Sequence, residues 1–255
     1  MKTVILCGGL GTRLSEETNL RPKPMVEIGG KPILWHIMKI YSKYGFNDFI
    51  LALGYKGDFI KDYFLNYHSR MSDFHVMLKS GKIDFINPYS EDWNISLIDT
   101  GSNTLTGGRL LKLQELLKNE NTFMLTYGDG VSNVNIEKLI HFHKSHGKIA
   151  TVTSVRPPAR FGGMDIQNHK VINFEEKPQS GEGWINGGFF IFNKKIFDYL
   201  ECDTTILERE PLENLSKDGE LMAFEHADFW QSMDTIRDKE LLQKFWDSGA
   251  APWNL

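Results

Sequence analysis

The chain has 255 residues, of which 41% are hydrophobic and 24% are charged, and its formal net charge is −4. This composition predicts an ordinary globular protein with a sizeable core, organised as a single domain over residues 1–255. A slightly acidic protein is unsuited to coating nucleic acid or an anionic membrane surface, so both are excluded as general partners.

Apolar runs of strand length alternate with segments of helical periodicity, a pattern that predicts an α/β fold with a mostly parallel sheet flanked by helices. In the first half of the chain we expect strands at 4–6, 49–53 and 122–126, and helices at 33–44, 59–67 and 110–117. Asp58 is the expected N-cap of the second helix. Residues 74–98 contain short strand-like runs that the sequence does not order.

In the second half, strands are expected at 150–155, 171–175, 184–192 and 221–224, and helices at 136–146, 207–215 and 235–246. His141, His143 and His146 fall near the end of helix 136–146. Their spacing favours helix-dipole and capping roles over metal binding.

A glycine-rich turn leaves the first predicted strand over Leu6-Cys7-Gly8-Gly9-Leu10-Gly11-Thr12-Arg13. Such a turn presents backbone N–H groups to an anion, and the Arg13 guanidinium suits phosphate oxygens, so we expect a nucleoside triphosphate to bind there. A dinucleotide fingerprint would need glycine at Leu14, and a Walker loop would need glycine at Arg13. The alternative is an ordinary strand-to-loop turn.

Asp129 follows the strand 122–126 closely and lies between Gly128 and Gly130. A carboxylate beyond the carboxyl end of a strand is placed to bind Mg²⁺ together with substrate phosphates, although Gly-Asp-Gly also suits a tight turn. Lys23 lies between two prolines and Lys177 precedes one, which predicts extended backbone at both residues. Each lysine is then either a positioned charge or a solvated surface lysine.

The sequence Asn186-Gly187-Gly188 interrupts an otherwise aromatic and β-branched strand. A glycine pair at such a place marks close approach of a ligand or of another backbone, or else a β-bulge.

The protein is expected in the cytoplasm. No apolar run approaches the roughly 20 residues of a membrane-spanning helix, and no charged-then-apolar leader precedes the first strand. The two cysteines, Cys7 and Cys202, are far apart in the sequence, which favours a buried free thiol in a reducing compartment.

Several segments carry a family resemblance. Gly8 to Arg13 together with Pro22-Lys23-Pro24 resembles the signature of sugar-1-phosphate nucleotidyltransferases. Leu14 to Thr18, Trp230 to Asp234 and other segments, over nearly the whole chain, resemble the cytidylyl branch of that family, which acts on glucose 1-phosphate.

The resemblance implies a Rossmann-like fold of the glycosyltransferase-A type with a small β-rich element on the substrate side. It also implies Mg²⁺-dependent transfer of a cytidylyl group from CTP to glucose 1-phosphate, by a homo-oligomer that feeds deoxysugar synthesis for surface polysaccharide. Arg13, Lys23, Asp129 and Lys177 would be the catalytic residues. The implied nucleotide-binding residues are Leu6, Cys7, Gly8, Gly9, Leu10, Gly11, Thr12, Arg13, Lys23, Thr104, Arg109 and Gly128.

By the same resemblance, Asp129 and Asp234 would hold Mg²⁺, although Asp234 reads equally well as the N-cap of the last helix. The sugar phosphate would be held by Glu176, Lys177, Asn186, Gly187 and Gly188. The sequence departs from the family pattern at Gly163, Ile206 and Ser232, which leaves the identity of the sugar open. Three alternatives remain: the same chemistry with another pyrimidine nucleotide or sugar phosphate, a non-catalytic sensor of nucleotide sugars, and, more distantly, a Rossmann dehydrogenase.

Overall fold

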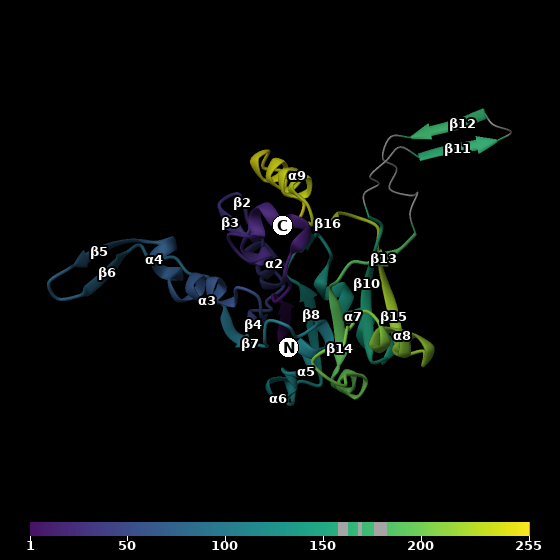
Figure 1. Ribbon diagram of the computed structural model, residues 1–255, viewed down its shortest axis with the longest axis horizontal. Coiled ribbons are helices and arrows are strands. Elements are labelled where there is room, and N and C mark those ends of the chain that lie inside the picture. The colour runs from purple at the N-terminus through teal and green to yellow at the C-terminus, as the bar shows by residue number, and fades with distance from the viewer. Residues whose placement is uncertain (158–162, 168–169, 176–182, 255) are drawn as a thin grey trace.

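The computed structural model describes residues 1–157, 163–167, 170–175 and 183–254. Its main sheet has eight strands in the order β13-β10-β14-β8-β1-β4-β7, with β15 paired to β10 (Figure 1). The strands of this sheet are β1 Thr3–Leu6, β4 Asp48–Leu53, β7 Asn94–Asp99, β8 Thr122–Tyr127, β10 Ala150–Val155, β13 Ile185–Asn186, β14 Phe190–Asn193 and β15 Leu221–His226.

The central strands of the sheet are parallel: β1 pairs with β4 and β8, and β4 pairs with β7. β15 is parallel to β10, whereas β13 and β14 run antiparallel to their neighbours. The expected α/β fold with a mostly parallel sheet is therefore confirmed. The helices are α1 Ser15–Thr18, α2 Ile33–Ser42, α3 Gly57–Leu65, α4 Tyr67–Met71, α5 Thr106–Leu111, α6 Gln114–Leu117, α7 Ile136–His146, α8 Glu210–Lys217 and α9 Ile236–Asp247.

Short 3₁₀ turns and two-stranded pairs complete the described fold. The 3₁₀ turns are η1 Thr12–Leu14, η2 Lys23–Met25 and η3 Lys194–Tyr199. The two-stranded pairs are β2 Glu27–Ile28 with β3 Lys31–Pro32, β5 Asp73–Met77 with β6 Lys82–Ile86, β9 Gly130–Ser132 with β16 Trp230–Ser232, and β11 Gly163–Gln167 with β12 Lys170–Glu175. In Figure 1, β5–β6 and β11–β12 project from the body of the molecule as separate hairpins.

Two hydrophobic clusters cover the two faces of the sheet. Side chains alternate along a strand, and accordingly Ile5 of β1 packs into one cluster while Val4 and Leu6 pack into the other. α2 and α7 contribute to the first cluster, and α5 and α8 to the second. The sheet is thus buried on both faces, which explains the nearly continuous apolar sequence of its central strands.

Two predicted helices differ from the structure for local reasons. The helix expected over 110–117 is two helices, and the first of them begins earlier, at Thr106. The early start was not predicted because Gly107 and Gly108 are poor helix formers. A Cβ on Gly108 would lie 2.3 Å from the carbonyl oxygen of Asp203, so close packing requires glycine there. The helix expected over 207–215 begins only at Glu210, with Pro211 in its first turn.

The strand expected over 184–192 is also divided, since β13 ends at Asn186 and β14 begins at Phe190. A Cβ on Gly187 would lie 2.6 Å from Cγ1 of Val155, and Gly188 has a φ of +74°. Gly187 therefore allows close approach of another part of the chain. Gly188 adopts a left-handed backbone conformation, which only glycine adopts freely.

The N-cap predicted at Asp58 was wrong, and the alternative N-cap role of Asp234 is not found in the structure. α3 is preceded by Lys56 in the left-handed region, and Asp58 lies inside its first turn. α9 is capped by Thr235, whose side chain forms a capping box with Asp238. Asp234 is therefore not the N-cap of α9, and its carboxylate is available for another contact.

Both cysteines are free thiols, Cys7 buried and Cys202 exposed. Burial raises the pKa of the Cys7 thiol well above its usual value, so it packs as a small apolar group, as expected. Among the helices of the described residues, none combines the length and the apolar character needed to cross a bilayer.

Two histidines of α7, His143 and His146, contact Thr151 of β10. His143 Nδ1 and His146 Nε2 each lie 2.8 Å from the Thr151 hydroxyl oxygen. Burial lowers the pKa of both histidines, which works against the charged form that an interaction with the helix dipole would need. His146 Nδ1 accepts a hydrogen bond from the N–H of Lys148 just beyond the helix, whose C-cap is Gly147.

We expect stability to fall as the pH falls from 6.5 to 4. Burial lowers the pKa of His36 and of His143 to about 4. Below pH 6.5 these histidines bind protons in the unfolded chain but not in the folded protein. Each histidine therefore lowers the free energy of unfolding by up to about 1.4 kcal/mol per pH unit. Urea unfolding at pH 7 and pH 5 measures this loss. His143→Gln should reduce it and His141→Gln, at an exposed site, should not; equal pH dependence in both variants would contradict the assignment.

Candidate active site

The predicted glycine turn and the predicted metal ligand leave neighbouring strands at the same edge of the sheet. β1 and β8 are parallel and in register, with Leu6 opposite Tyr127. The turn from Gly8 to Arg13 and the segment Gly128-Asp129 therefore start side by side. This edge is where ligands bind in open α/β sheets.

A cleft of about 600 Å³ opens between these segments. It is lined by the nucleotide-site residues that the sequence predicts, by Pro24 and Tyr127, by Ser102 to Thr106, and by both candidate metal ligands. The predicted residues on its walls are Leu6, Cys7, Gly8, Gly9, Leu10, Gly11, Thr12, Arg13, Lys23, Thr104, Arg109, Gly128, Asp129 and Asp234.

Lys23 lies between the two aspartates. Its Nζ donates to Asp129 Oδ2 and to Asp234 Oδ1, at 2.7 Å in each case, and the residue is only 9% exposed. Burial alone would lower the pKa of Lys23, but the two carboxylates outweigh it and hold the pKa above its usual value. Two carboxylates separated by 106 and 211 residues from this lysine are thus brought to one point.

The glycines beside Asp129 make this approach possible. A Cβ on Gly128 would lie 2.9 Å from Pro24 Cγ and 3.0 Å from the carbonyl oxygen of Leu6. The Pro22-Lys23-Pro24 segment can therefore pack directly against the end of β8. This contact places Lys23 beside Asp129.

Asp234 is placed by the chain between β16 and α9. The N–H of Met233 donates to the carbonyl oxygen of Asp129 at 2.8 Å, which fixes the two acidic segments to each other. Burial would raise the pKa of Asp234, but the hydrogen bond and charge of Lys23 hold it below its usual value. Arg13 Nη1 is 3.6 Å from Asp234 Oδ2, and its side chain is 76% exposed, so it can follow a bound phosphate.

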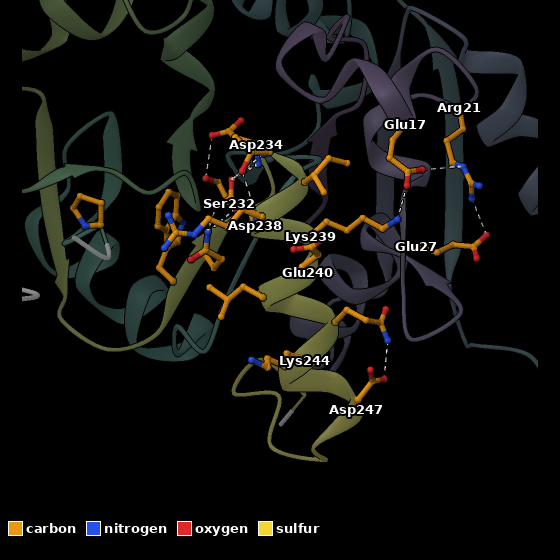
Figure 2. Close-up of a pocket in the computed structure, with 18 of the residues that line it drawn as sticks. Glu17, Arg21, Glu27, Ser232, Asp234, Asp238, Lys239, Glu240, Lys244 and Asp247 are labelled. Carbon is orange, nitrogen blue, oxygen red and sulfur yellow. Dashed lines mark hydrogen bonds and ion pairs between the residues drawn. The ribbon is translucent and has the colours of Figure 1, made fainter. Parts of the chain in front are cut away.

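A second groove, of about 1250 Å³, runs from Asp234 along α9. Figure 2 shows Lys239 of α9 reaching across it to Glu17 of α1, which also contacts Arg21. α1 begins just after Arg13, and α9 begins just after Asp234. The ion pair between Lys239 and Glu17 therefore ties together the two helices that follow these site residues.

Arg109 holds the glycine turn from below. Its guanidinium donates to the carbonyl oxygens of Gly8 at 3.0 Å and Leu53 at 2.9 Å, and to the Thr100 hydroxyl at 2.7 Å. The side chain is almost fully buried. Arg109 thus lines the cleft, as expected of the nucleotide site, but its contacts within the chain are structural.

Gly8→Ala is expected to destabilise the protein by about 1–3 kcal/mol. A Cβ on Gly8 would lie 2.1 Å from the Arg109 guanidinium carbon, so the buried clamp must shift. The matched control is Gly9→Ala, because a Cβ on Gly9 meets nothing within 4 Å. Thermal unfolding of the two variants tests the contact, and equal melting temperatures would contradict it.

The predicted sugar-phosphate residues are only partly brought to the cleft. Glu176 and Lys177 lie outside the described residues. Asn186 Nδ2 donates to the hydroxyl of Tyr127, a cleft residue, at 3.2 Å. Trp230 Nε1 donates to the carbonyl oxygen of Gly187 at 2.8 Å. The Asn186-Gly187-Gly188 segment thus borders the cleft next to Tyr127.

Sequence reasoning from residues alone missed Tyr127, Glu208 and the role of Asp234. Tyr127 Oη donates to Glu208 Oε1 at 2.6 Å. The position of Tyr127, one residue before the Gly-Asp-Gly segment, could have marked it as a cleft residue. Nothing local marks Glu208 or Asp234, since the chain brings them in from far away.

Comparison with known proteins identifies the family of the chain. The family model described as "Nucleotidyl transferase" matches residues 2–231. The chain is 54% identical over 253 residues to glucose-1-phosphate cytidylyltransferase of Salmonella typhi, covering 99% of this chain and 98% of the relative. It is 47% identical over 256 residues to the probable glucose-1-phosphate cytidylyltransferase of Bacillus subtilis, covering 100% of each.

Among solved structures, HddC from Yersinia pseudotuberculosis superposes with a TM-score of 0.70 at 26% identity, covering 96% of this chain and 99% of that one. The family model and the curated relatives both span most of the chain, and the signature from Gly8 to Arg13 with Lys23 lies within the matched region. The chain belongs to the nucleotidyl transferase family.

Proposed function

We propose that the protein transfers a cytidylyl group from CTP to glucose 1-phosphate, which gives CDP-glucose and pyrophosphate. The names of the two relatives described above, which match over almost their full lengths, support this choice of substrates. The observation that carries it is Lys23 held between Asp129 and Asp234 beside a glycine turn. A buried cation and two carboxylates at one point suit the handling of polyphosphate.

The chemistry requires charge rather than a base. The second pKa of a phosphate monoester is about 6, so a sugar 1-phosphate is mostly a dianion at neutral pH and its oxygen is already nucleophilic. The obstacle is the repulsion between this dianion and the triphosphate. In-line attack on the α-phosphorus then depends on positioning and on electrostatic stabilisation.

We assign Lys23 to the α-phosphate, Arg13 to the departing pyrophosphate and Lys177 to the incoming sugar phosphate. Lys23 is buried at the strand edge and Arg13 is exposed at the cleft mouth, which suits an inner and an outer phosphate respectively. The backbone N–H groups of the glycine turn and the residues Thr104, Arg109 and Gly128 would bind the rest of the nucleotide.

The donor set fits Mg²⁺. Asp129 and Asp234 place carboxylate oxygens around a single point that already accommodates the ammonium of Lys23. Among the described residues there is no group of three or more His, Cys, Asp or Glu side chains that could hold a metal. Mg²⁺ usually takes one or two carboxylates and completes its shell with phosphate and water. When bound, the ion would neutralise phosphate charge.

Release of pyrophosphate tests the proposed function. Wild-type protein is mixed with CTP, UTP or dTTP and a panel of sugar 1-phosphates, with and without Mg²⁺. We expect turnover to be fastest with CTP and glucose 1-phosphate and to require the metal ion. Faster turnover with another pair would correct the substrates. Binding of CDP-glucose with no turnover of any pair would show a non-catalytic sensor instead.

We also propose that the protein is a homo-oligomer assembled through the hairpin β5–β6. Phe74 faces Phe85 across the hairpin and Val76 faces Ile83, so one face carries four apolar side chains, all of them exposed. A lone two-stranded hairpin is at best marginally stable in water, and an exposed apolar face of this kind marks an interaction surface. A second copy of the chain is the partner that is always present in equal amount.

Phe74→Ser combined with Phe85→Ser is expected to dissociate the oligomer, because it replaces the apolar face by a polar one. The matched control replaces His75 and Asp84, the cross-strand pair on the other face of the hairpin. Light scattering after gel filtration gives the masses. The assembly is refuted if wild-type protein has the 29.3 kDa mass of one chain, or if the double Phe variant keeps the wild-type mass.

The cytoplasm remains the proposed location. Its support is that both cysteines are free thiols, which is the usual state in a reducing compartment.

A further inference from the structure

A chain of hydrogen bonds links two residues that line the cleft, Thr106 and Tyr127, to Asn186 of the proposed sugar-phosphate segment. The Thr106 hydroxyl donates to Glu208 Oε2 at 2.6 Å, and the Tyr127 hydroxyl donates to Glu208 Oε1 at 2.6 Å. The Tyr127 oxygen in turn accepts from Asn186 Nδ2 at 3.2 Å. Thr106 Oγ1 also accepts from the N–H of Leu207 at 2.9 Å.

The Asn186 amide is oriented at both of its ends. Its Oδ1 accepts from the N–H of Gly188 at 2.8 Å, and its Nδ2 donates to Tyr127. The Tyr127 ring lies against the backbone of Gly188, since a Cβ there would be 3.1 Å from the ring. The segment Asn186-Gly187-Gly188 is therefore seated on Tyr127.

Tyr127 is also rigidly placed relative to Asp129. It is the last residue of β8, and its ring packs edge-on against Phe190 of β14 at 5.9 Å between centroids. Its partner Glu208 has both carboxylate oxygens occupied by hydroxyl donors, so this carboxylate holds Tyr127 in place. Asn186 itself is exposed.

We infer that Tyr127, held by Glu208, is a positioning residue for the acceptor sugar phosphate and acts through Asn186. This inference rests on the proposed function, because it takes the segment from Asn186 to Gly188 to contact the sugar phosphate. The phenol sets the distance between that segment and Asp129, and hence the placement of the acceptor relative to the α-phosphorus. The glycine turn of the nucleotide pocket is held separately, by the Arg109 guanidinium.

Tyr127→Phe tests the inference because it keeps the ring and removes only the hydroxyl. The variant loses the hydrogen bond to Glu208 and the one from Asn186. The second of these seats Asn186, and its loss is expected to raise KM for glucose 1-phosphate about tenfold. KM for CTP should stay within about twofold. Tyr199→Phe is the matched control, since that hydroxyl donates to Asp218 at 2.9 Å outside the cleft.

Asn186→Ala, alone and combined with Tyr127→Phe, separates positioning from a general structural role. If Tyr127 acts through Asn186, the double variant should behave like Asn186→Ala alone. Glu208→Gln retains an acceptor for the phenol and should be milder than Glu208→Ala, which should reproduce the rise in KM for glucose 1-phosphate seen in Tyr127→Phe. Only Tyr127→Phe is used for the comparison with KM for CTP, because Glu208→Ala also removes the partner of the Thr106 hydroxyl. Effects that multiply in the double variant, or equal rises in both KM values, would overturn the inference.

Wild-type turnover is measured first, so that failure of the proposed function is seen separately. If wild-type protein prefers another sugar 1-phosphate, the same comparison is made with that acceptor. Calorimetric titration of glucose 1-phosphate into wild-type protein and Tyr127→Phe provides a readout without turnover. A tenfold weaker affinity in the variant supports the inference, and equal affinities overturn it.

Discussion

Replacing Lys23 by alanine is expected to lower kcat/KM for CTP by about 10²–10³-fold, the range found when one preorganised charge is removed from a phosphoryl- or acyl-transfer site. Lys23 is a buried cation at this edge of the sheet, and it is held by two carboxylates at 2.7 Å. Its loss leaves two negative charges facing each other and the α-phosphate without its assigned partner. Lys23→Arg should not restore activity, because a planar guanidinium does not fit between the two carboxylates as a compact ammonium does.

Two further measurements make this result specific. Lys39→Ala is the matched control, since Lys39 pairs with Glu91 at 2.9 Å away from the cleft, and its activity should stay within twofold of wild type. Mg²⁺ should raise the melting temperature of Lys23→Ala more than that of wild-type protein, because the ammonium no longer fills the point between the carboxylates. Turnover of Lys23→Ala within a few-fold of wild type would show that Lys23 has no part in catalysis.

Asp129→Asn and Asp234→Asn are each expected to reduce kcat by about 10²-fold or more and to shift half-saturation to higher Mg²⁺ concentration. Each amide keeps the shape of the side chain but removes one of the two charges that would hold the ion. The low pKa of Asp234 means that its carboxylate is ionised over the whole neutral range, so the loss should not depend on pH there.

Asp247→Asn provides the control for the aspartate variants. Asp247 lies at the far end of the groove that runs from Asp234 along α9, and among the described contacts it accepts only from Gln243, at 2.7 Å. Titration of Mg²⁺ in the pyrophosphate assay gives the comparison. An unchanged Mg²⁺ requirement in both Asp129→Asn and Asp234→Asn would exclude the two carboxylates as the metal site.

The parts of the fold that could be predicted from the sequence are those where burial pattern and local chemistry agree. The strands at β1, β4 and β8 are apolar runs buried on both faces, and α7 matches its predicted bounds of 136–146. Prediction failed where a tertiary contact overrides local preference. Gly107 and Gly108 are poor helix formers, yet they lie in α5 because Asp203 and Thr205 pack directly against them.

The candidate site divides in the same way. The glycine turn and Asp129 could be found from the sequence, because a phosphate-binding turn and a carboxylate beyond a strand end have local signatures. Local reasoning could not decide whether Asp234 is a metal ligand or an N-cap, since both roles suit an aspartate before a helix. Only the fold shows that Thr235 caps α9 and that Asp234 meets Lys23.

A crystal structure of the protein with CTP and Mg²⁺ tests the central claim most directly. The account predicts that the triphosphate lies along the turn from Gly8 to Arg13, that one Mg²⁺ ion contacts both Asp129 and Asp234, and that Lys23 moves to the α-phosphate. A triphosphate bound away from that turn, with no ion touching either aspartate, would contradict it.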